Sequence, residues 1–484
     1  AGTAITTGDN NVAVGFEALK TNATSAQNTA VGHTALKLNT AANNTAFGYA
    51  ALTANSTGTY NVALGRSAGA AITTGIENTI GGARAGAALT TGQENAVFGQ
   101  QALSADTAGN HSTAIGHGAL FSQNFTSSTD SNNTAVGFSA GAAVTTGISN
   151  TLIGGLTGDA ITTGGSNSAV GAEALGATTT GNSNVAVGRW SMAANTTASE
   201  NVAVGVASLS TNTTGTGNVA VGHLALNLST TASNNTAVGI RALTANTTGI
   251  SNVAVGKGAS ASMTTGGTNT TLGMDAGGEV TTGGSNVLLG YGATFYSGNP
   301  QLTTGSDNTI IGTFARTSSS TVSSEIAIGR YVLGQGTLTA TVGVNGQGAT
   351  ISLDGTDTSW AAHSDQRLKE NITTSTAGLS FVNDLRPVTY TWKAKNAISE
   401  DFVNYYDADS TDPVNGVAGK TYHGFLAQEM KATIDDHSEV ANGNNLWAER
   451  VDDIQQLAPS NLVPMLTKAI QELSTQLDAA LARI

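Results

Sequence analysis

The sequence has no cysteine, few charges and few aromatic residues, and each shortage excludes a class of protein. Without Cys among its 484 residues, the chain can form no disulfide, no thiolate zinc site and no thiol nucleophile. Charged residues make up 11% of the chain and aromatic residues 5%, so one large aromatic core is not expected. The net charge of −13 disfavours nucleic acid as a partner, because proteins that bind it carry basic patches.

Long apolar runs and metal motifs are also missing. No run of about 18 apolar residues occurs, so we expect no membrane insertion. No cofactor motif and no periodic Gly-Gly-x-Gly-x-Asp calcium repeat appears, so neither a cofactor nor a metal is expected. What is abundant instead is Gly, with 61 residues, together with Ala, Thr and Asn. This composition favours a repetitive β architecture built from small residues.

A strict repeat fills the first two thirds of the chain. The unit is "NVAVGxxAL" followed by a Thr/Gly/Asn turn, and its glycine occurs 19 times from Gly15 to Gly329. Of the 18 gaps between these glycines, fifteen are 17 residues long and the others are 16, 21 and 22. So regular a period indicates one structural rung per repeat, stacked on similar neighbours.

Each rung reads as a short strand and two turns. In "NVAVG", Val12 and Val14 point to one face and Ala13 to the other, which is the period of a β-strand. Segments such as "EALK" add an Ala/Leu pair, and "TTG" turns suit tight backbone. We therefore predict a mostly β fold, a parallel β-roll or solenoid over residues 1–329. Its small core is expected to hold Val, Leu and Ala, while Asn and Thr stack in ladders along the axis.

The repeat resembles a known family. "NxAVGxxAxxxxxxN" is similar to the head repeats of trimeric autotransporter adhesins, and similar repeats occur in phage tail fibres. The resemblance implies a homotrimeric, left-handed parallel β-roll, although that family's rungs are usually shorter. Independently of the resemblance, a thin roll buries little apolar area, so a homo-oligomer is expected. At about 4.8 Å per rung, the shaft is roughly 90 Å long.

Two rungs are overlong and carry aromatic residues. One contains Phe121 and Phe125, and the other contains Phe295 and Tyr296. Loops with exposed aromatic side chains on a rigid scaffold are candidate receptor contacts. The alternative, which is the simpler one, is a lateral bulge that packs its own aromatic side chains.

The composition changes near Trp360. Residues 1–360 hold 9 Lys/Arg and 15 Asp/Glu, whereas the much shorter segment 361–484 holds 10 and 17. We predict a β connector over residues 330–362 and a separate mixed α/β domain over residues 363–484.

Several secondary-structure elements of the C-terminal domain can be predicted from its sequence. A helix is expected from Leu379 to Leu385, ended by Pro387, and a strand at "VTYTWK". "TYHGFLAQEM" reads as a strand that leads into a helix. A final helix follows whose apolar residues recur at heptad spacing, which predicts a trimerising coiled coil. These residues are Leu466, Ile470, Leu473, Leu477, Ala480 and Ile484.

Four motifs of this domain occur in the order seen in one family: "SDQRLKENI", "LRPVTYTWK", "HGFLAQEM" and "LVPMLTKAIQEL". They resemble the S74 peptidase family, the C-terminal intramolecular chaperone of phage tail spikes and tail fibres. The resemblance implies that this domain trimerises, sets the register of the upstream β-structure and then cuts itself off.

The same resemblance implies roles for single residues. Ser364 matches the nucleophile, Lys369 the base, and the cleavage site is the His363–Ser364 bond. Supporting roles fall to Asp365, His423, Gln428 and Glu429, each of which could instead satisfy buried polar groups. A Lys acts as a base only if its surroundings lower its pKa. Burial of Lys369 on trimer assembly could therefore make it a competent base.

From "SDQRLKEN" alone, a solvated helix N-cap is the favoured interpretation, and the three later motifs reverse that preference. If the family motifs hold, the chain is at most a single-turnover self-cleaving endopeptidase with no external substrate. The leading hypothesis is therefore a phage tail fibre in the virion. Its partners would be itself as a homotrimer, a glycan or protein receptor on the host surface and an N-terminal tail component.

Three other hypotheses remain for the whole chain. A bacterial trimeric surface adhesin, located at the cell surface, would have the same roll and a retained trimerisation domain. A polysaccharide-degrading tail spike would need paired carboxylates in a groove, and the acidic residues of the repeats do not recur at a fixed position. An ice-binding protein would need a flat Thr array, but Thr here falls in turns.

Overall fold

The structure is a computed structural model that describes residues 1–295, 301–355, 366, 369–401, 406–440, 446–449 and 455–483. The chain divides into two compact units, Ala1–His363 and Ser364–Ile484. Each unit has its own hydrophobic core. The predicted parallel β-solenoid and the predicted C-terminal helix are both confirmed.

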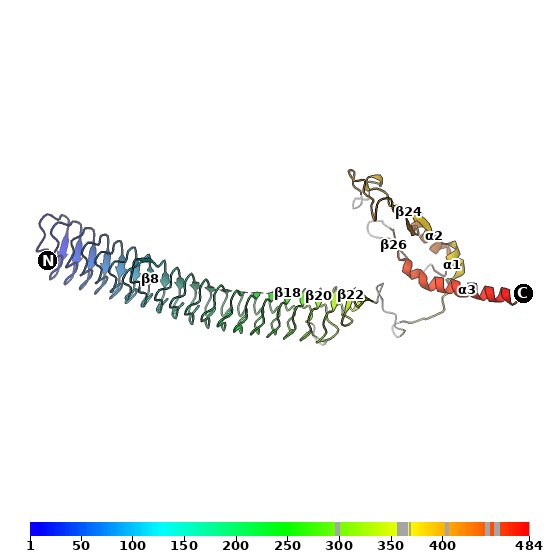
Figure 1. Cartoon of the computed structure of the whole chain (residues 1–484), viewed down its shortest axis with the longest axis horizontal. Helices are drawn as coiled ribbons and strands as arrows, with labels where there is room; N and C mark the ends of the chain where they lie inside the picture. Colours follow the sequence, from blue (N-terminus) through cyan, green and yellow to red (C-terminus); the bar gives the residue numbers. More distant parts are fainter. Residues whose placement is uncertain are drawn as a thin grey trace. The chain divides into compact units, whose positions relative to one another are not determined.

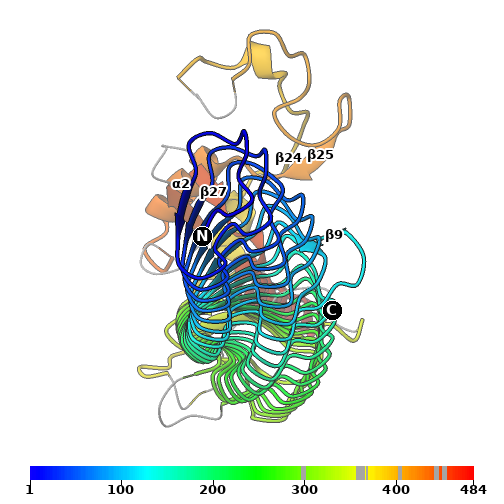
Figure 2. The ribbon, with the colours of Figure 1, turned by 90° about the vertical axis from the view of Figure 1, so that its left-hand side faces the viewer.

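The first unit is a shaft of stacked rungs, each with one short strand on the same side (Figure 1). Neighbouring strands are parallel, and in most pairs the register is one repeat, as in Val185 beside Val202. Seen from the end, the rungs overlap as loops of similar outline (Figure 2). The strands are β1 Val12–Val14, β2 Thr29–Val31, β3 Thr45–Phe47, β4 Val62–Leu64, β5 Thr79–Gly81, β6 Ala96–Phe98, β7 Gly109–Asn110, β8 Thr113–Ile115, β9 Thr129–Asp130, β10 Thr134–Val136, β11 Thr151–Ile153, β12 Ser168–Val170, β13 Val185–Val187, β14 Val202–Val204, β15 Val219–Val221, β16 Thr236–Val238, β17 Val253–Val255, β18 Thr270–Leu272, β19 Val287–Leu289, β20 Thr309–Ile311 and β21 Ile326–Ile328.

The strand alternation was predicted correctly, but the side that faces the core was not. The middle residue of the strand is buried, as is Ala186, while Val185 and Val187 on either side are exposed. The expectation that these valines fill the core is therefore wrong. The core instead consists of the middle strand residue and the Ala/Leu pair after the turn, such as Ala18 and Leu19. Each strand thus turns its middle residue inward and its two flanking residues outward.

Asn side chains form the predicted ladder along the axis. Asn218 Nδ2 donates to Asn201 Oδ1 at 3.2 Å, and the Asn218 backbone N–H donates to the same oxygen at 2.9 Å. Asn218 Nδ2 also donates to the Ala232 carbonyl at 2.8 Å, which ties the strand to the opposite turn. Turn threonines add a second ladder, since the Thr213 hydroxyl donates to the Thr230 carbonyl at 3.0 Å. Buried polar groups are thus paired between rungs, which holds the stack together.

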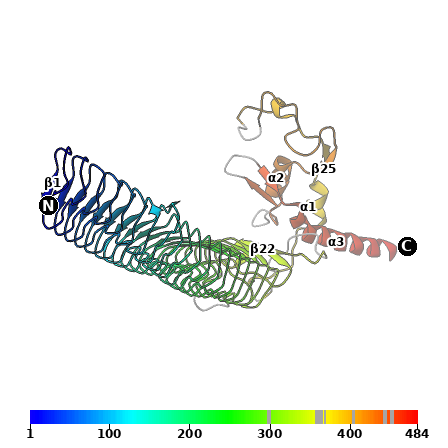
Figure 3. The ribbon, with the colours of Figure 1, turned by 60° about the vertical axis from the view of Figure 1, so that its left-hand side comes forward.

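The strand-ending glycine is required by geometry. At Gly188, φ is +126°, and a Cβ there would lie 2.6 Å from the Gly205 carbonyl oxygen. Only glycine allows both this backbone conformation and this approach of the next rung. The repeat glycine found in the sequence is therefore a position where successive rungs, stacked along the shaft in Figure 3, come close together.

A hairpin closes the C-terminal end of the shaft. β22 Thr339–Val344 pairs in parallel with β21, and β23 Gln347–Ser352 returns antiparallel to β22. Asn345 and Gly346 form the turn with φ of +53° and +77°, as Asn-Gly prefers. This hairpin lies within the segment for which a β connector was expected.

The second unit is small and mixed. Its elements are α1 Leu379–Asp384, β24 Val388–Tyr390, η2 Lys395–Ala397, β25 Tyr422–Gly424, α2 Ala427–Asp436, β26 Trp447–Glu449, β27 Gln455–Leu457, η3 Pro459–Leu462 and α3 Val463–Leu481. β24 pairs with β25 and β26 with β27, both antiparallel. The core gathers around Phe381 of α1 and Met430 and Ile434 of α2.

Candidate functional site

The predicted cleavage site is only partly within the described residues. His363, Ser364 and Asp365 lie outside them, so their roles remain predictions. Lys369 is described and exposed, and its backbone N–H donates to the Gln366 carbonyl at 3.1 Å. In a single chain, therefore, Lys369 is not in the buried setting that a basic amine needs.

The other predicted site residues lie around β25 and the start of α2. His423 is exposed on β25 and pairs across the sheet with Thr389. Gln428, in the first turn of α2, lines an open hollow of about 950 Å³ together with Trp392 and Phe425. His423 and Gln428, which are five positions apart in the sequence, thus lie on two consecutive elements, β25 and α2.

Glu429 forms an ion pair with Arg386. Arg386 Nε donates to Glu429 Oε2 at 2.9 Å, and Arg386 Nη2 donates to Glu429 Oε1. The hydrogen bonds from Arg386 lower the pKa of Glu429, and Glu429 raises the pKa of Arg386. A carboxylate held ionised in this way is a poor proton donor. The ion pair with Arg386 joins α2 to the segment before β24, so Glu429 has a structural role here.

A histidine clasp that the sequence reasoning missed lies at the end of α2. His437 Nδ1 is 2.9 Å from Glu439 Oε1, and its Nε2 is 2.8 Å from Asp384 Oδ2 at the end of α1. These hydrogen bonds, first that of Glu439, raise the pKa of His437. The ring also packs edge-on against Phe381. Asp384 and His437 are 53 positions apart, so no spacing in the sequence could have revealed the contact.

Helix α3 has one face on its own unit and another that is bare. Glu472 Oε2 accepts a hydrogen bond from the Leu379 backbone N–H at 2.8 Å, so α3 caps the start of α1. This hydrogen bond lowers the pKa of Glu472. Ala469 is buried on the same side. The predicted heptad residues lie elsewhere on α3 and are exposed, except Ile484, which lies outside the described residues: Leu466 42%, Ile470 67%, Leu473 55%, Leu477 59%.

The shaft carries a second bare apolar surface. The last residue of almost every strand is apolar and points away from the core, which forms a continuous row that we call the strand stripe. Its exposed members include Val14, Phe47, Leu64, Phe98, Ile115, Ile153, Val170, Val187, Leu272 and Ile328. Single exposed apolar residues are ordinary, but a contiguous row of this length is typical of an interface.

The first overlong rung divides between the two interpretations. Phe121 is 42% exposed, as a receptor contact requires, but Phe125 is only 7% exposed. The receptor-contact prediction for Phe125 is therefore corrected in favour of a bulge that packs its own aromatic side chain: the ring lies beside Gly109, and the backbone N–H donates to buried Asp106 Oδ1 at 3.0 Å. Phe295 is half-buried beside Gly278, and Tyr296 lies outside the described residues.

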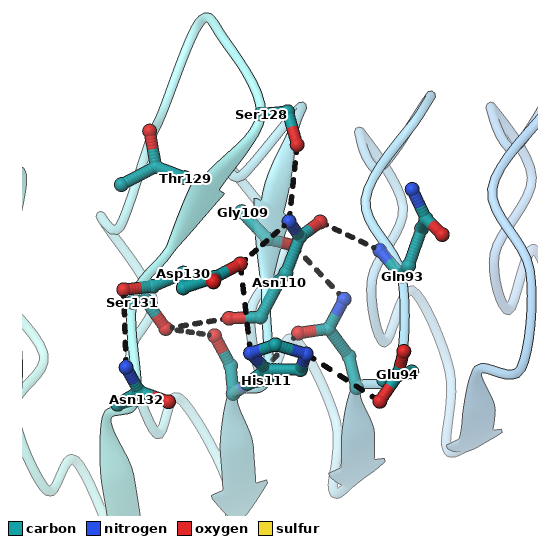
Figure 4. Close-up of polar contacts among 12 residues, drawn as sticks. Gln93, Glu94, Gly109, Asn110, His111, Ser128, Thr129, Asp130, Ser131 and Asn132 are labelled. Carbon is teal, nitrogen blue, oxygen red and sulfur yellow. Dashed lines mark hydrogen bonds and ion pairs between the residues drawn. The ribbon is translucent and has the colours of Figure 1, made fainter.

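A polar clasp fixes the first bulge to the rungs before it (Figure 4). Asn110 Nδ2 donates to Ser128 Oγ at 3.1 Å and to Asp130 Oδ1 at 3.0 Å. His111 lies between two carboxylates, with Nε2 3.4 Å from Glu94 and Nδ1 3.5 Å from Asp130. The short pair β7 and β9 runs alongside. This bulge is an ordered part of the shaft surface.

Neither a membrane-spanning helix nor a metal-holding cluster is found among the described residues. In this part of the chain, no helix is both long enough and apolar enough to cross a membrane. The same part contains no group of three or more His, Asp or Glu side chains arranged to hold a metal ion.

Comparison with known families identifies part of the second unit. Residues 364–439 match the Peptidase_S74 family model, described as the chaperone of endosialidase. No curated protein matches the sequence. The chain is thus a parallel β-solenoid followed by a C-terminal unit that is similar, over residues 364–439, to the chaperone of endosialidase. This combination fits a phage tail fibre or tail spike. Helix α3 lies beyond the matched residues.

Proposed function

We propose that the chain is a subunit of a homotrimeric phage tail fibre or tail spike that attaches the virion to its host. In this proposal the C-terminal unit brings three chains together, aligns the shafts and is then released by self-cleavage. The single observation that carries the proposal is the pair of bare apolar surfaces, one on each unit.

Both surfaces need a partner of matching shape. The seam of α3 recurs at heptad spacing, so copies of the same helix pack against it as knobs into holes. The strand stripe repeats once per rung, and the surface that repeats with the same spacing is another copy of the shaft. One face of α3 is held by its own unit, and its heptad face would be covered by association with other copies.

Self-cleavage requires only groups of this chain and water. Lys369, deprotonated once buried by assembly, accepts the proton of the Ser364 hydroxyl. Ser364 Oγ attacks the carbonyl carbon of His363, the peptide C–N bond breaks, and an ester forms with release of the Ser364 α-amine. Water then hydrolyses the ester and leaves a carboxylate on His363. The family match, which begins at residue 364, supports this position.

Host attachment uses the outer surface of the shaft. The bulge with exposed Phe121 offers an aromatic contact beside polar side chains, which suits a glycan or a protein on the host surface. A tail component at the N-terminal side would hold the fibre on the virion. His423 and Gln428 would support the cleavage reaction, and Asp365 would do the same.

The oligomeric state of the full chain tests the central part of this proposal. Leu473→Asp places a charge in the α3 seam, and Ser474→Asp, at the next exposed position, is the matched control. Sedimentation should give a trimer for the wild type and for Ser474→Asp, and monomers or aggregates for Leu473→Asp. A wild-type monomer, or a trimer that Leu473→Asp leaves intact, would refute trimerisation through α3.

A further inference from the structure

The core of the shaft is not uniform along its length. Three buried positions recur in each rung: the middle strand residue, the second residue of the Ala/Leu pair and a residue three positions later. We call them the inner, the central and the outer core positions. In the rungs from Asn167 to Ser251, these positions hold Ala, then Leu or Met, then Asn, Ser or Thr.

A few rungs reverse this pattern. Where the central position is Gly, the outer position becomes apolar: Gly69 with Ile72, Gly86 with Leu89, Gly141 with Val144, Gly158 with Ile161 and Gly277 with Val280. The side chain that is lost at one position is replaced at the other. The core volume of the rung is thereby roughly kept, as close packing requires.

The inner position changes together with the central one. Leu152 fills the space left by two glycines, because a Cβ on Gly141 or on Gly158 would each lie 2.8 Å from a Leu152 methyl carbon. Ile80 stands in the same relation to Gly69 and Gly86, at 3.1 Å from each built Cβ.

The third case is Leu288, whose Cδ1 would lie 2.8 Å from a Cβ on Gly277. Each of the five glycines therefore has a bulky inner residue in its own rung or in the next one.

We infer that these blocks act as register keys, which determine which rung stacks on which during assembly of the shaft. We call a rung with Ala at the inner and Leu or Met at the central position a plain rung. If one plain rung were left out of a stack of plain rungs (a skip), Ala would still lie on Ala and Leu on Leu, with no loss of packing. Where a skip removes Leu152, Gly141 is left beside a cavity. Where a skip stacks Leu152 directly above Leu120, the two side chains compete for one space. Either error is costly in a close-packed core.

The keys bracket the plain stretch. The blocks around Leu152 and Leu288 lie on either side of rungs 167–251, in which slippage would otherwise go unopposed. This inference concerns stacking within one chain and holds whether or not three chains associate. It adds local control of register along the shaft to the control that a C-terminal chaperone exerts at one end.

Two deletions of one rung each, made in the full chain, test the inference. Deletion of 201–217 removes a plain rung, whereas deletion of 150–166 removes the rung of Leu152 and Gly158. Both deletions remove 17 residues and rejoin the Asn ladder, at Asn184 to Asn218 and at Asn133 to Asn167. We expect the first variant to resist protease and heat like the parent. The second should be digested about tenfold faster or more, because Gly141 then faces a cavity.

A rescue distinguishes a key from general damage. Gly141→Leu with Val144→Asn converts the preceding rung to the plain pattern. This pair should destabilise the full-length chain, where the new Leu overlaps Leu152, but should restore stability to the 150–166 deletion. Equal stability of the two deletions, or failure of the pair to rescue, would overturn the inference.

Discussion

The two units of this chain are stabilised in different ways. The shaft repeats one neutral rung, with a small aliphatic core and ladders of amide and hydroxyl groups, and its stability grows with each added copy. The C-terminal unit has a small core and relies on side-chain contacts between separate elements, such as Arg386–Glu429, His437–Asp384 and Glu472–Leu379. The shaft is therefore expected to depend mainly on neutral contacts between rungs, and the C-terminal unit to be more easily opened.

This difference matches the roles that we propose for the two units. A fibre has to persist outside the cell, which suits a shaft whose ladders consist of neutral amide and hydroxyl groups. A chaperone that aligns three chains and then leaves needs only enough stability for that task.

The largest effect is expected from a change that breaks the rung geometry. Gly188→Val introduces a side chain where φ is +126° and where the Gly205 carbonyl lies 2.6 Å from the new Cβ. We expect a loss of about 3 kcal/mol or more per chain in the free energy of unfolding, measured by thermal unfolding of the shaft.

Gly155→Ala is the matched control, because no atom lies within 4 Å of a Cβ built there. If Gly188→Val were as stable as this control, close stacking at the repeat glycine would not limit the shaft.

A smaller loss is expected when the amide ladder is interrupted. Asn218→Leu removes the acceptor for the Asn235 N–H and the donor to the Ala232 carbonyl, both in the buried interior. Unpaired buried groups should lower the free energy of unfolding by about 2–3 kcal/mol, read from denaturant unfolding. Exposed Asn182→Ala should cost clearly less. Equal costs would mean that the ladder adds nothing beyond ordinary surface hydrogen bonds.

A pH-dependent effect is expected in the C-terminal unit. Hydrogen bonds from Glu439 and Asp384 raise the pKa of His437 above its ordinary value of about 6.5, so the protonated clasp stabilises the unit fully below that value. This stabilisation is lost as the pH rises through the raised pKa of the folded state. The protection of α1 and α2 against hydrogen exchange should therefore fall as the pH rises above about 6.5.

His437→Ala should flatten this pH profile, whereas His423→Ala, a change at an exposed histidine, should leave it unchanged. A profile that persists in His437→Ala would assign the pH dependence to another group.

The smallest effect is expected at the exposed ion pair. Arg386→Met removes the partner that lowers the pKa of Glu429, but both side chains are largely solvated. The variant should differ little from the parent in thermal unfolding, and the difference should shrink further in high salt. A large difference that survives salt would show that Arg386 acts mainly through packing.

The fold could be predicted from the sequence because the same short pattern recurs in every repeat. The glycine period, the strand alternation and the Ala/Leu pair all have a local physical cause within one rung. The inside of the strand was assigned wrongly because alternation defines two faces without saying which is covered. Val185 and Val187 are as apolar as core residues, yet only Ala186 between them faces the interior.

The site was harder to predict, because its contacts join distant parts of the chain. The clasp at His437 depends on α1 and α2 packing together, which no spacing reveals. Phe125 looked like an exposed loop residue, but the buried Asp106 holds its backbone inward. The core keys are visible in the sequence as Gly69 followed by Ile72, although their meaning depends on knowing which positions face one another.

The most direct test of the proposed function is the intact mass of the purified full chain under denaturing conditions, beside Ser364→Ala. We predict that the wild type splits into two fragments that meet at the His363–Ser364 bond and that Ser364→Ala remains whole. A wild-type chain that stays whole although it forms trimers would contradict self-cleavage and make the C-terminal unit a permanent part of the fibre.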